Sequence, residues 1–421
     1  MRTWVWGGVA VSAVFFTAGC KIETTTDADE MGGNSALAGG NSGGSAQGGS
    51  SGGNTSNAGA KSSGGQGGDG NTQGEAGASG DTSGVGFTPS NVPSSAIGDA
   101  KGDLILGGAN CSNTTVTLDT DTGAIRGCSL EADTDYAFAQ VEQADGSKLG
   151  VFVANRIRIE QTITANVNGQ LPLVLVARDT LQVIGKLQAA GARSEAVAGG
   201  FPGVSNLSNT PGNGPGAGGA GKVGGGGSYC GKGGKSSTNT SAGGVPYSTP
   251  DIVPLVGGSS GGAATIWDSG AGGGAVQLIA GTSIQISATG IINVGGGGGG
   301  QGSNGGGSGG AILLEAPTVT VAGILAANGG GGGSGSGAEK GQNGLPSSAP
   351  ASGGGTDVKG GNGSAGASLD GEPGAVSEDY EAGGGGGAGV IRINTASGSA
   401  TITGSLSPSL ATSCATQGTL L

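Results

Sequence analysis

Residues 174–187 read VLVARDTLQVIGKL, in which short runs of alternating aliphatic residues are separated by a polar corner at Arg178-Asp179 and by Gly185. Similar runs occur once before this stretch and three times after it. They are VFVA, IRI and ITA (151–165), VQLIAGTSIQI (276–286), AILLEAPTVTVAGIL (311–325), and VIRIN with ATITGSL (390–406). Alternation over a few residues is typical of a strand, and small or polar residues between strands predict corners.

One such unit has too few aliphatic side chains to form a core by itself. Stacking units in register gives continuous ladders of aliphatic side chains, and it pairs the backbone of each strand with the next unit. The sequence therefore predicts an all-β fold, a parallel β-helix or β-solenoid, over residues 149–421. Strands paired as an antiparallel sandwich would contradict this prediction.

Long glycine-rich insertions separate the later units, at residues 199–274, 295–310 and 328–388. The chain has 103 glycines in 421 residues and only 3% aromatic residues. Two arrangements fit these insertions. They are either mobile excursions from one face of the solenoid, or left-handed threefold polyglycine helices (polyglycine II) packed where only glycine fits. The strict Gly-X-Y period of collagen is missing.

The first residues have the pattern of an export signal. Arg2 precedes an apolar run from Trp4 to Phe16, which is shorter than the ~20 residues that a membrane-spanning helix needs. We therefore expect residues 1–19 to be a signal peptide that is removed.

Ala18-Gly19-Cys20 resembles the lipobox of bacterial lipoproteins, although Thr17 stands where leucine is usual. The resemblance implies that the Cys20 thiol carries a lipid and that the chain is anchored to a membrane. Lys21, in place of the aspartate that retains lipoproteins at the inner membrane, implies the outer membrane, at its periplasmic face or at the cell surface. An ordinary cleaved signal with a chance cysteine is the alternative.

Two further segments precede the solenoid. Residues 20–95 are mostly Gly, Ser, Asn, Ala and Thr, a composition that predicts a disordered linker with a reach on the order of 45 Å. Residues 96–148 contain three strand-like runs, LIL (104–106), TVTL (115–118) and YAFAQV (136–141). We expect a small β cap here that shields the first exposed edge of the solenoid.

Charge and composition exclude several classes of function. The formal net charge is −12 and the basic residues are scattered, so we expect no nucleic-acid partner. The chain contains no histidine, which excludes His-dependent triads, His general bases and His metal ligands. We therefore expect no cofactor, no metal site and no catalytic residue of these kinds.

Four cysteines remain after Cys20, and an exported chain with an even number of cysteines favours disulfides. The pair Cys111 and Cys128 brackets a hairpin-like segment and closes a short loop, so it is the preferred one of three possible pairings. Cys230 and Cys414 then pair by elimination.

The repeated units and the C-terminal tail resemble glycine-rich, uncharacterised surface lipoproteins of Gram-negative bacteria, from about Ile97 onward. The residues that carry this resemblance are PLVLVA (172–177), GGAILLEAP (309–317), GVIRIN (389–394) and CATQGTL (414–420). The resemblance implies a fold and a location but no established activity.

The leading functional hypothesis is a surface-displayed structural or adhesive lipoprotein without catalytic activity, whose partners are the membrane and an extracellular polysaccharide. The rival is a polysaccharide-active β-helix enzyme, a lyase or hydrolase, which needs a pair of carboxylates or acidic calcium ligands. One acidic stretch of the sequence is dense enough to supply them, but a solvated loop whose charges serve solubility is the favoured explanation, because charge runs are usually that. It consists of Asp370, Glu372, Glu378, Asp379 and Glu381.

A third hypothesis is a module that binds glycans or ice. Ice binding needs threonines aligned on one flat face, and six lie near the expected strands: Thr180, Thr282, Thr318, Thr320, Thr401 and Thr403. Sugar binding commonly uses exposed aromatic rings, and the loops offer Tyr229, Tyr247, Trp267 and Tyr380.

Overall fold

The computed structural model describes residues 84–236 and 240–421, which form an all-β body with two single-turn 3-10 helices, η1 (Ser94–Ala96) and η2 (Gly108–Asn110). The expected signal peptide (1–19), Cys20 and most of the expected linker lie outside the described residues.

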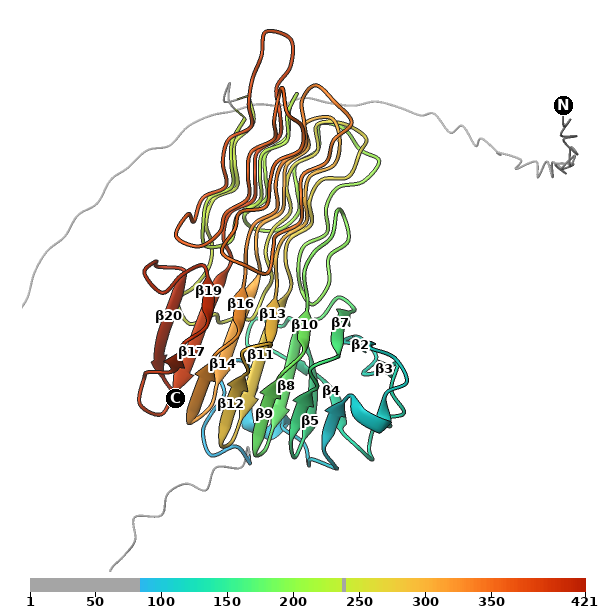
Figure 1. Cartoon of the computed structure of the whole chain (residues 1–421), viewed down its shortest axis with the longest axis vertical. Coiled ribbons are helices and arrows are strands. Elements are labelled where there is room, and N and C mark those ends of the chain that lie inside the picture. Colours follow the sequence, from blue (N-terminus) through green and yellow to red (C-terminus); the bar gives the residue numbers. More distant parts are fainter. Residues whose placement is uncertain (1–83, 237–239) are drawn as a thin grey trace, which may run out of the picture. The chain divides into compact units, whose positions relative to one another are not determined.

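The body contains three sheets in which nearly all strands are parallel (Figure 1). The first sheet has the order β1 (Leu104–Leu106), β6 (Ile157–Ile159), β9 (Thr180–Val183), β12 (Ser283–Ile286), β15 (Thr318–Val321), β18 (Thr401–Ile402). The second has the order β19 (Ser405–Ser407), β16 (Ile324–Ala326), β13 (Ile291–Asn293), β10 (Lys186–Gln188), β7 (Thr164–Asn168), β2 (Thr115–Asp119), β3 (Ile125–Arg126). The third has the order β20 (Ala415–Thr419), β17 (Val390–Thr395), β14 (Ala311–Glu315), β11 (Ala275–Ala280), β8 (Leu173–Ala177), β5 (Lys148–Ala154), β4 (Ala137–Glu142).

From β5 onward, consecutive strands lie in different sheets, and strands from distant parts of the chain lie side by side. After β8 the chain forms β9 in the first sheet and β10 in the second, and the next three strands repeat this order one layer further on. Residues at equivalent positions are therefore stacked. One inner ladder consists of Phe152, Leu175, Leu278, Leu314 and Ile393, all fully buried.

These ladders form the core between the sheets. Neighbouring strands are about 4.8 Å apart, so each aliphatic side chain contacts its equivalent in the next layer. Burying one such side chain stabilises the fold by ~1.5–3 kcal/mol. The ladder repeats in every layer, which is why the same alternating pattern recurs in the sequence.

The third sheet is buried on its outer face as well. Every residue of β8, β11 and β14 is buried, whereas in β9, β12 and β15 of the first sheet buried positions alternate with more exposed ones. Two segments contribute to this outer cluster, residues 84–97, here called the N-terminal strap, and residues 245–256. The strap buries Val85, Phe87 and Val92, so its contacts begin inside the range expected to be linker.

Residues 96–148 contribute both to the parallel stack and to its end. Strands β1 and β2 pair in parallel with β6 and β7, because they have the same alternating pattern as the later units. Strands β3 and β4 pair antiparallel with their neighbours and are the last strands of the second and third sheets. The boundary expected at residue 148 therefore divides strands that lie in the same sheets.

The glycine-rich segments continue from the strands as a bundle of extended chains beside one another (Figure 1). Backbone hydrogen bonds join segments that are far apart in sequence. One series runs from the Gly386 N–H to the Gly330 carbonyl, from Gly330 to Gly307, from Gly307 to Gly297, and from Gly297 to Ala271, with N–O distances of 2.8–2.9 Å. Since five segments take part in this one series, the bundle has its own hydrogen-bonded order.

Close approach of the backbones explains the glycine content of the bundle. A Cβ atom on Gly307 would collide with the Ala271 carbonyl group, and one on Gly385 would collide with that of Asn362. In both cases the obstacle is backbone, which a rotamer change cannot move. Any larger residue would force these segments apart.

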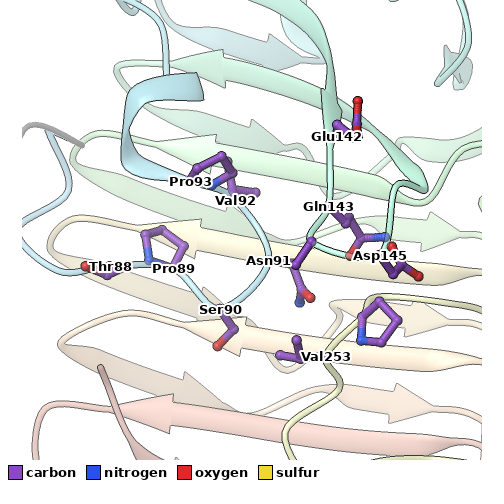
Figure 2. A pocket seen from close by; sticks show the side chains of 12 residues that line it. Thr88, Pro89, Ser90, Asn91, Val92, Pro93, Glu142, Gln143, Asp145 and Val253 are labelled. Carbon is purple, nitrogen blue, oxygen red and sulfur yellow. The ribbon is translucent and has the colours of Figure 1, made fainter.

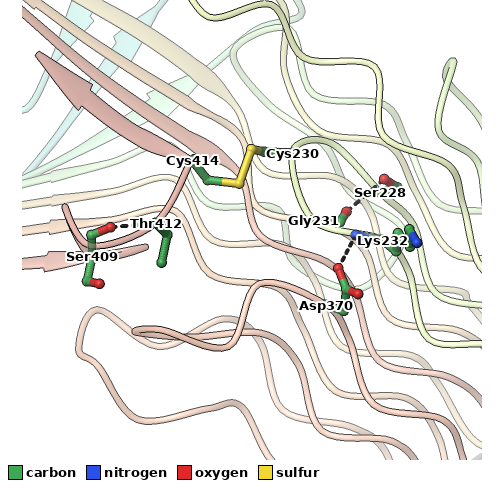
Figure 3. Close-up of a disulfide and its surroundings, with 8 residues drawn as sticks. All are labelled: Ser228, Cys230, Gly231, Lys232, Asp370, Ser409, Thr412 and Cys414. Atoms are coloured by element: carbon green, nitrogen blue, oxygen red, sulfur yellow. Dashed lines mark hydrogen bonds between the residues drawn. A yellow bond between two sulfur atoms is a disulfide. The ribbon is translucent and has the colours of Figure 1, made fainter.

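Two disulfides join the described residues in the expected pairing, Cys111 with Cys128 and Cys230 with Cys414. The second bond connects a glycine-rich insertion to the residue that precedes β20 (Figure 3). It therefore ties the bundle to the last layer of the sheets.

Candidate functional site

The acidic stretch proposed from the sequence is divided in the structure. The Asp370 carboxylate accepts a hydrogen bond from the Lys232 backbone N–H at 2.8 Å, near the Cys230–Cys414 disulfide (Figure 3). The Glu372 carboxylate accepts one from the Asn362 side-chain amide at 2.7 Å. These two acids fix backbone and side-chain positions within the bundle.

The other three acids lie together in one turn. Val376 and Glu381 are paired through their backbones in an isolated antiparallel β-bridge, and Glu378, Asp379 and Tyr380 lie between them. This turn lines a cavity of about 390 Å³ together with Lys222, which belongs to a different insertion. The Ser303 hydroxyl donates a hydrogen bond of 2.5 Å to the Glu381 carbonyl oxygen and so connects the turn to a third insertion.

Asn304, the next residue, holds the loop that carries Trp267. Its side chain is fully buried, and its Oδ1 atom accepts hydrogen bonds from the N–H groups of Ala264 and Thr265 at 2.7 and 3.1 Å. Its Nδ2 group donates to the carbonyl oxygens of Trp267 and Gln301 at 2.8 and 2.9 Å. A buried amide that is bonded on both sides fixes a loop strongly, because breaking any of these bonds leaves a buried polar group unpaired.

We name this region the tip: residues 265–268, 301–304 and 376–381. Four large apolar side chains of the tip are at least half exposed to solvent: Ile266 (60%), Trp267 (53%), Tyr380 (52%) and Val376 (50%). Ser303 is hydrogen-bonded to the loop of residues 376–381, and Asn304 is hydrogen-bonded to the loop of residues 265–268. Trp267 and Tyr380 therefore lie on two loops that adjacent residues hold in place. Ile266 and Trp267 lie on one of these loops and Val376 and Tyr380 on the other, and exposed large apolar residues on fixed loops are candidates for binding.

Two aromatic residues that the sequence offered for sugar stacking are structural. Tyr229 is 1% exposed, and its ring packs against that of Tyr247 with the centroids 4.7 Å apart. The Tyr247 hydroxyl donates to the Gly257 carbonyl oxygen at 2.6 Å. Burial raises the pKa of both phenols, so both stay neutral. The stacking hypothesis was wrong for Tyr229, because its ring is buried against other segments. Tyr247 is half-buried and anchors its loop through the bond to Gly257.

The threonine array is incomplete. The outer face of the first sheet carries one row of Thr180, Ser283 and Thr318 and a second row of Arg158, Gln182, Gln285, Thr320 and Thr401. Thr282 and Thr403 lie outside the strands. The face is a mixed polar surface, which β-sheet propensity and solvation explain.

A separate cavity of about 530 Å³ lies beside the N-terminal strap. Strap residues 88–93, the turn at residues 142–145, and Val253 with Pro254 line it (Figure 2). Sequence reasoning missed this site because the strap was expected to belong to the linker. Val85 and Phe87 could have indicated that the strap is packed, since apolar residues are rare in the glycine- and serine-rich sequence that precedes them.

Within residues 84–236 and 240–421, no three acidic or cysteine side chains lie close enough to hold a metal ion. The same part of the chain has no helix of the length and apolarity that crossing a membrane requires. Comparison with protein-family models, curated proteins and solved structures found no match for the chain.

Proposed function

We propose that the protein is a surface-displayed, lipid-anchored adhesive or structural protein of the outer membrane, which binds an extracellular polysaccharide through the tip and catalyses no reaction. The observation that carries this proposal is the exposure of Trp267 and Tyr380 on loops that Ser303 and Asn304 hold in place. Sugar rings have apolar faces that pack on aromatic side chains, while carboxylates and amines bond to their hydroxyl groups. Glu378, Asp379 and Lys222 line the cavity beside Tyr380 and supply such groups.

The body that carries the tip is, in this proposal, a β-solenoid with polyglycine II insertions. The hydrogen bonds of Gly307 support the polyglycine II conformation of the insertions. Its N–H bonds to the segment of Gly297, and its carbonyl accepts from the segment of Gly330. In a pleated strand the N–H and the carbonyl group of one residue point toward the same neighbouring strand. In a threefold helix these two groups point toward different neighbouring chains.

Such a bundle suits a structural support. A single glycine-rich chain is flexible, but the lateral hydrogen bonds hold each segment against several others. The lipid on Cys20 and the linker up to the strap would tether the body to the membrane, as the sequence pattern predicts. The insertions would then present the tip away from the sheets.

The test is binding of the purified mature chain, coupled to beads, to extracellular polysaccharide from the producing bacterium and to a panel of purified glycans. Trp267→Ala and Tyr380→Ala should each weaken binding about tenfold, because one aromatic–ligand contact stabilises a complex by about 0.5–1.5 kcal/mol beyond area burial. Leu410→Ala is the matched control, since Leu410 is 40% exposed and lies outside the tip.

Two results would contradict the proposal. The first is binding that the tip substitutions leave unchanged. The second is a gene deletion that leaves surface attachment, cell aggregation and envelope integrity unaltered. Release of products from uronate-containing polymers, with or without calcium, would instead favour the enzymatic alternative.

A further inference from the structure

Strand β20 lies at an open edge of the third sheet. It pairs with β17 on one side, and no described residue pairs with it on the other, so it is the outermost strand of that sheet (Figure 1). Strands β17, β18 and β19 form one layer of the three sheets, and β20 lies one layer beyond β18 and β19. It therefore projects from this end of the stack, where another strand can reach it.

The backbone groups of β20 alternate between its two sides. The Leu420 N–H donates to the Thr395 carbonyl oxygen of β17 at 3.1 Å. Every second residue of a strand bonds to a given neighbour, so the even-numbered residues of β20 bond to β17. The N–H and carbonyl groups of Ala415, Gln417 and Thr419 therefore point away from β17, and none of them bonds to the backbone of another described residue.

Charged side chains protect the opposite end of the stack but not this one. None of residues 393–421 is aspartate, glutamate, lysine or arginine, although charged residues make up 11% of the whole chain. At the other end, Arg126 lies in β3 and Glu142 in β4, and both are exposed. Proteins commonly use such charges to keep exposed sheet edges from pairing. The β20 edge lacks this protection.

The chemistry of this end fits a second copy of the chain. Two identical edges related by a twofold axis run antiparallel and offer each other the same donors and acceptors. With the axis at Gln417, this residue faces its own equivalent, and Ala415 faces Thr419 of the second copy. Facing residues of this kind exchange two hydrogen bonds. The formal net charge of −12 makes most of the surface repel a second copy, whereas the uncharged end does not.

We propose that two copies of the protein associate through their β20 strands, which pair antiparallel and join the two third sheets into one continuous sheet. Both copies use the same edge, so the assembly closes at two copies. Pairing of β20 with the opposite end, which would build an open filament, is disfavoured by the exposed charge of Glu142 on β4. The dimer carries two tips, but the inference does not depend on their function.

The experiment is sedimentation velocity of the full mature chain over a wide range of protein concentrations. All samples carry Cys20→Ser, so that neither a lipid nor a thiol at this position joins two copies. We expect a reversible monomer–dimer equilibrium. Thr419→Pro should raise its dissociation constant about tenfold or more, because each copy loses an N–H that bonds to the other. Thr419 is exposed and its N–H points away from β17, so the proline is compatible with the fold.

A second pair of variants tests the same edge without proline. Thr419→Lys should weaken the dimer several-fold, because a lysine on an edge strand opposes pairing. Thr115→Lys is the matched control, since Thr115 is also an exposed strand residue but lies in β2 at the opposite end of the stack. A chain that stays monomeric at every concentration, a dimer that both Thr419 variants leave intact, or equal weakening by Thr115→Lys would each overturn the proposal.

Discussion

The side-chain amide of Asn304 donates a hydrogen bond of 2.8 Å to the Trp267 carbonyl oxygen, across 37 positions in the sequence. Asn304 begins the return path of one glycine-rich insertion, whereas Trp267 lies at the end of another. The buried side chain of Asn304 therefore fixes the position of the loop that carries the exposed Trp267. The glycine segments bring the two loops together, and the amide fixes them.

The first prediction concerns this contact. Asn304→Ala should release the loop of Trp267, because the N–H groups of Ala264 and Thr265 and the Trp267 carbonyl oxygen lose their partner; each buried unpaired group costs about 1–3 kcal/mol. Trp4 and Trp6 belong to the expected signal peptide, so Trp267 is the only tryptophan of the mature chain. Its fluorescence anisotropy should fall in the variant while far-UV circular dichroism stays unchanged. An unaltered anisotropy would show that other contacts hold the loop.

The second prediction concerns the attachment of the N-terminal strap. Both the N–H and the hydroxyl of Ser90 donate to the buried Glu315 carboxylate, at 3.2 and 2.6 Å. Ser90→Ala should reduce the free energy of unfolding of the strap by about 1.5–3 kcal/mol, the usual value for a hydrogen bond to a charged group. Limited proteolysis should then cut within residues 84–97 sooner. The control is Thr88→Ala, since the exposed Thr88 side chain makes no hydrogen bond to a described residue. Equal cleavage rates in the two variants would argue against this role of Ser90.

The third prediction compares the two disulfides. Cys230 and Cys414 are 184 residues apart, and Cys111 and Cys128 are 17 apart. If each bond acts mainly by restricting the unfolded chain, replacing the distant pair with serine destabilises the protein by about 5 kcal/mol and replacing the near pair by about 3 kcal/mol. Thermal unfolding of the two double variants should therefore rank them in this order. The reverse order would mean that local packing around Cys111 and Cys128 outweighs chain entropy.

The fourth prediction tests the close packing of glycine. Gly307→Ala should destabilise the bundle by about 1–3 kcal/mol or more, because its Cβ atom would collide with the backbone of Ala271. Gly337→Ala is the control, since its Cβ would lie 3.7 Å from the nearest atom, the Ser334 hydroxyl oxygen. Calorimetry should show a lower unfolding temperature for the first variant only. Equal stability would indicate that the segments can separate freely.

The sequence predicted the strands well because their side chains repeat. Leu175, Leu278 and Leu314 occupy equivalent places in the alternating pattern, and parallel pairing puts them in one ladder. The same logic identified β1 and β2, although they were assigned to a separate cap. The all-β fold with parallel sheets is confirmed.

Other features depend on contacts between distant segments, which a single sequence does not show. Nothing near Tyr229 indicates that its ring is buried against that of Tyr247, so it seemed as available as Trp267. Ser303 and Asn304 interrupt a glycine run, and only the packing of three insertions gives them a role in the tip. The acidic residues were identified in sequence, but their division between two places depends on the path of the glycine segments.

The glycine-rich insertions form a hydrogen-bonded bundle that supports the tip, and the proposed function depends on the order of this bundle. Amide hydrogen exchange over residues 295–310, 328–334 and 383–389 measures this order, because Gly307, Gly330 and Gly386 each donate a backbone hydrogen bond to another segment. We expect slow exchange in these peptides, comparable to that of β11 and β14. Complete exchange within seconds, at the rate of an unstructured chain, would contradict it.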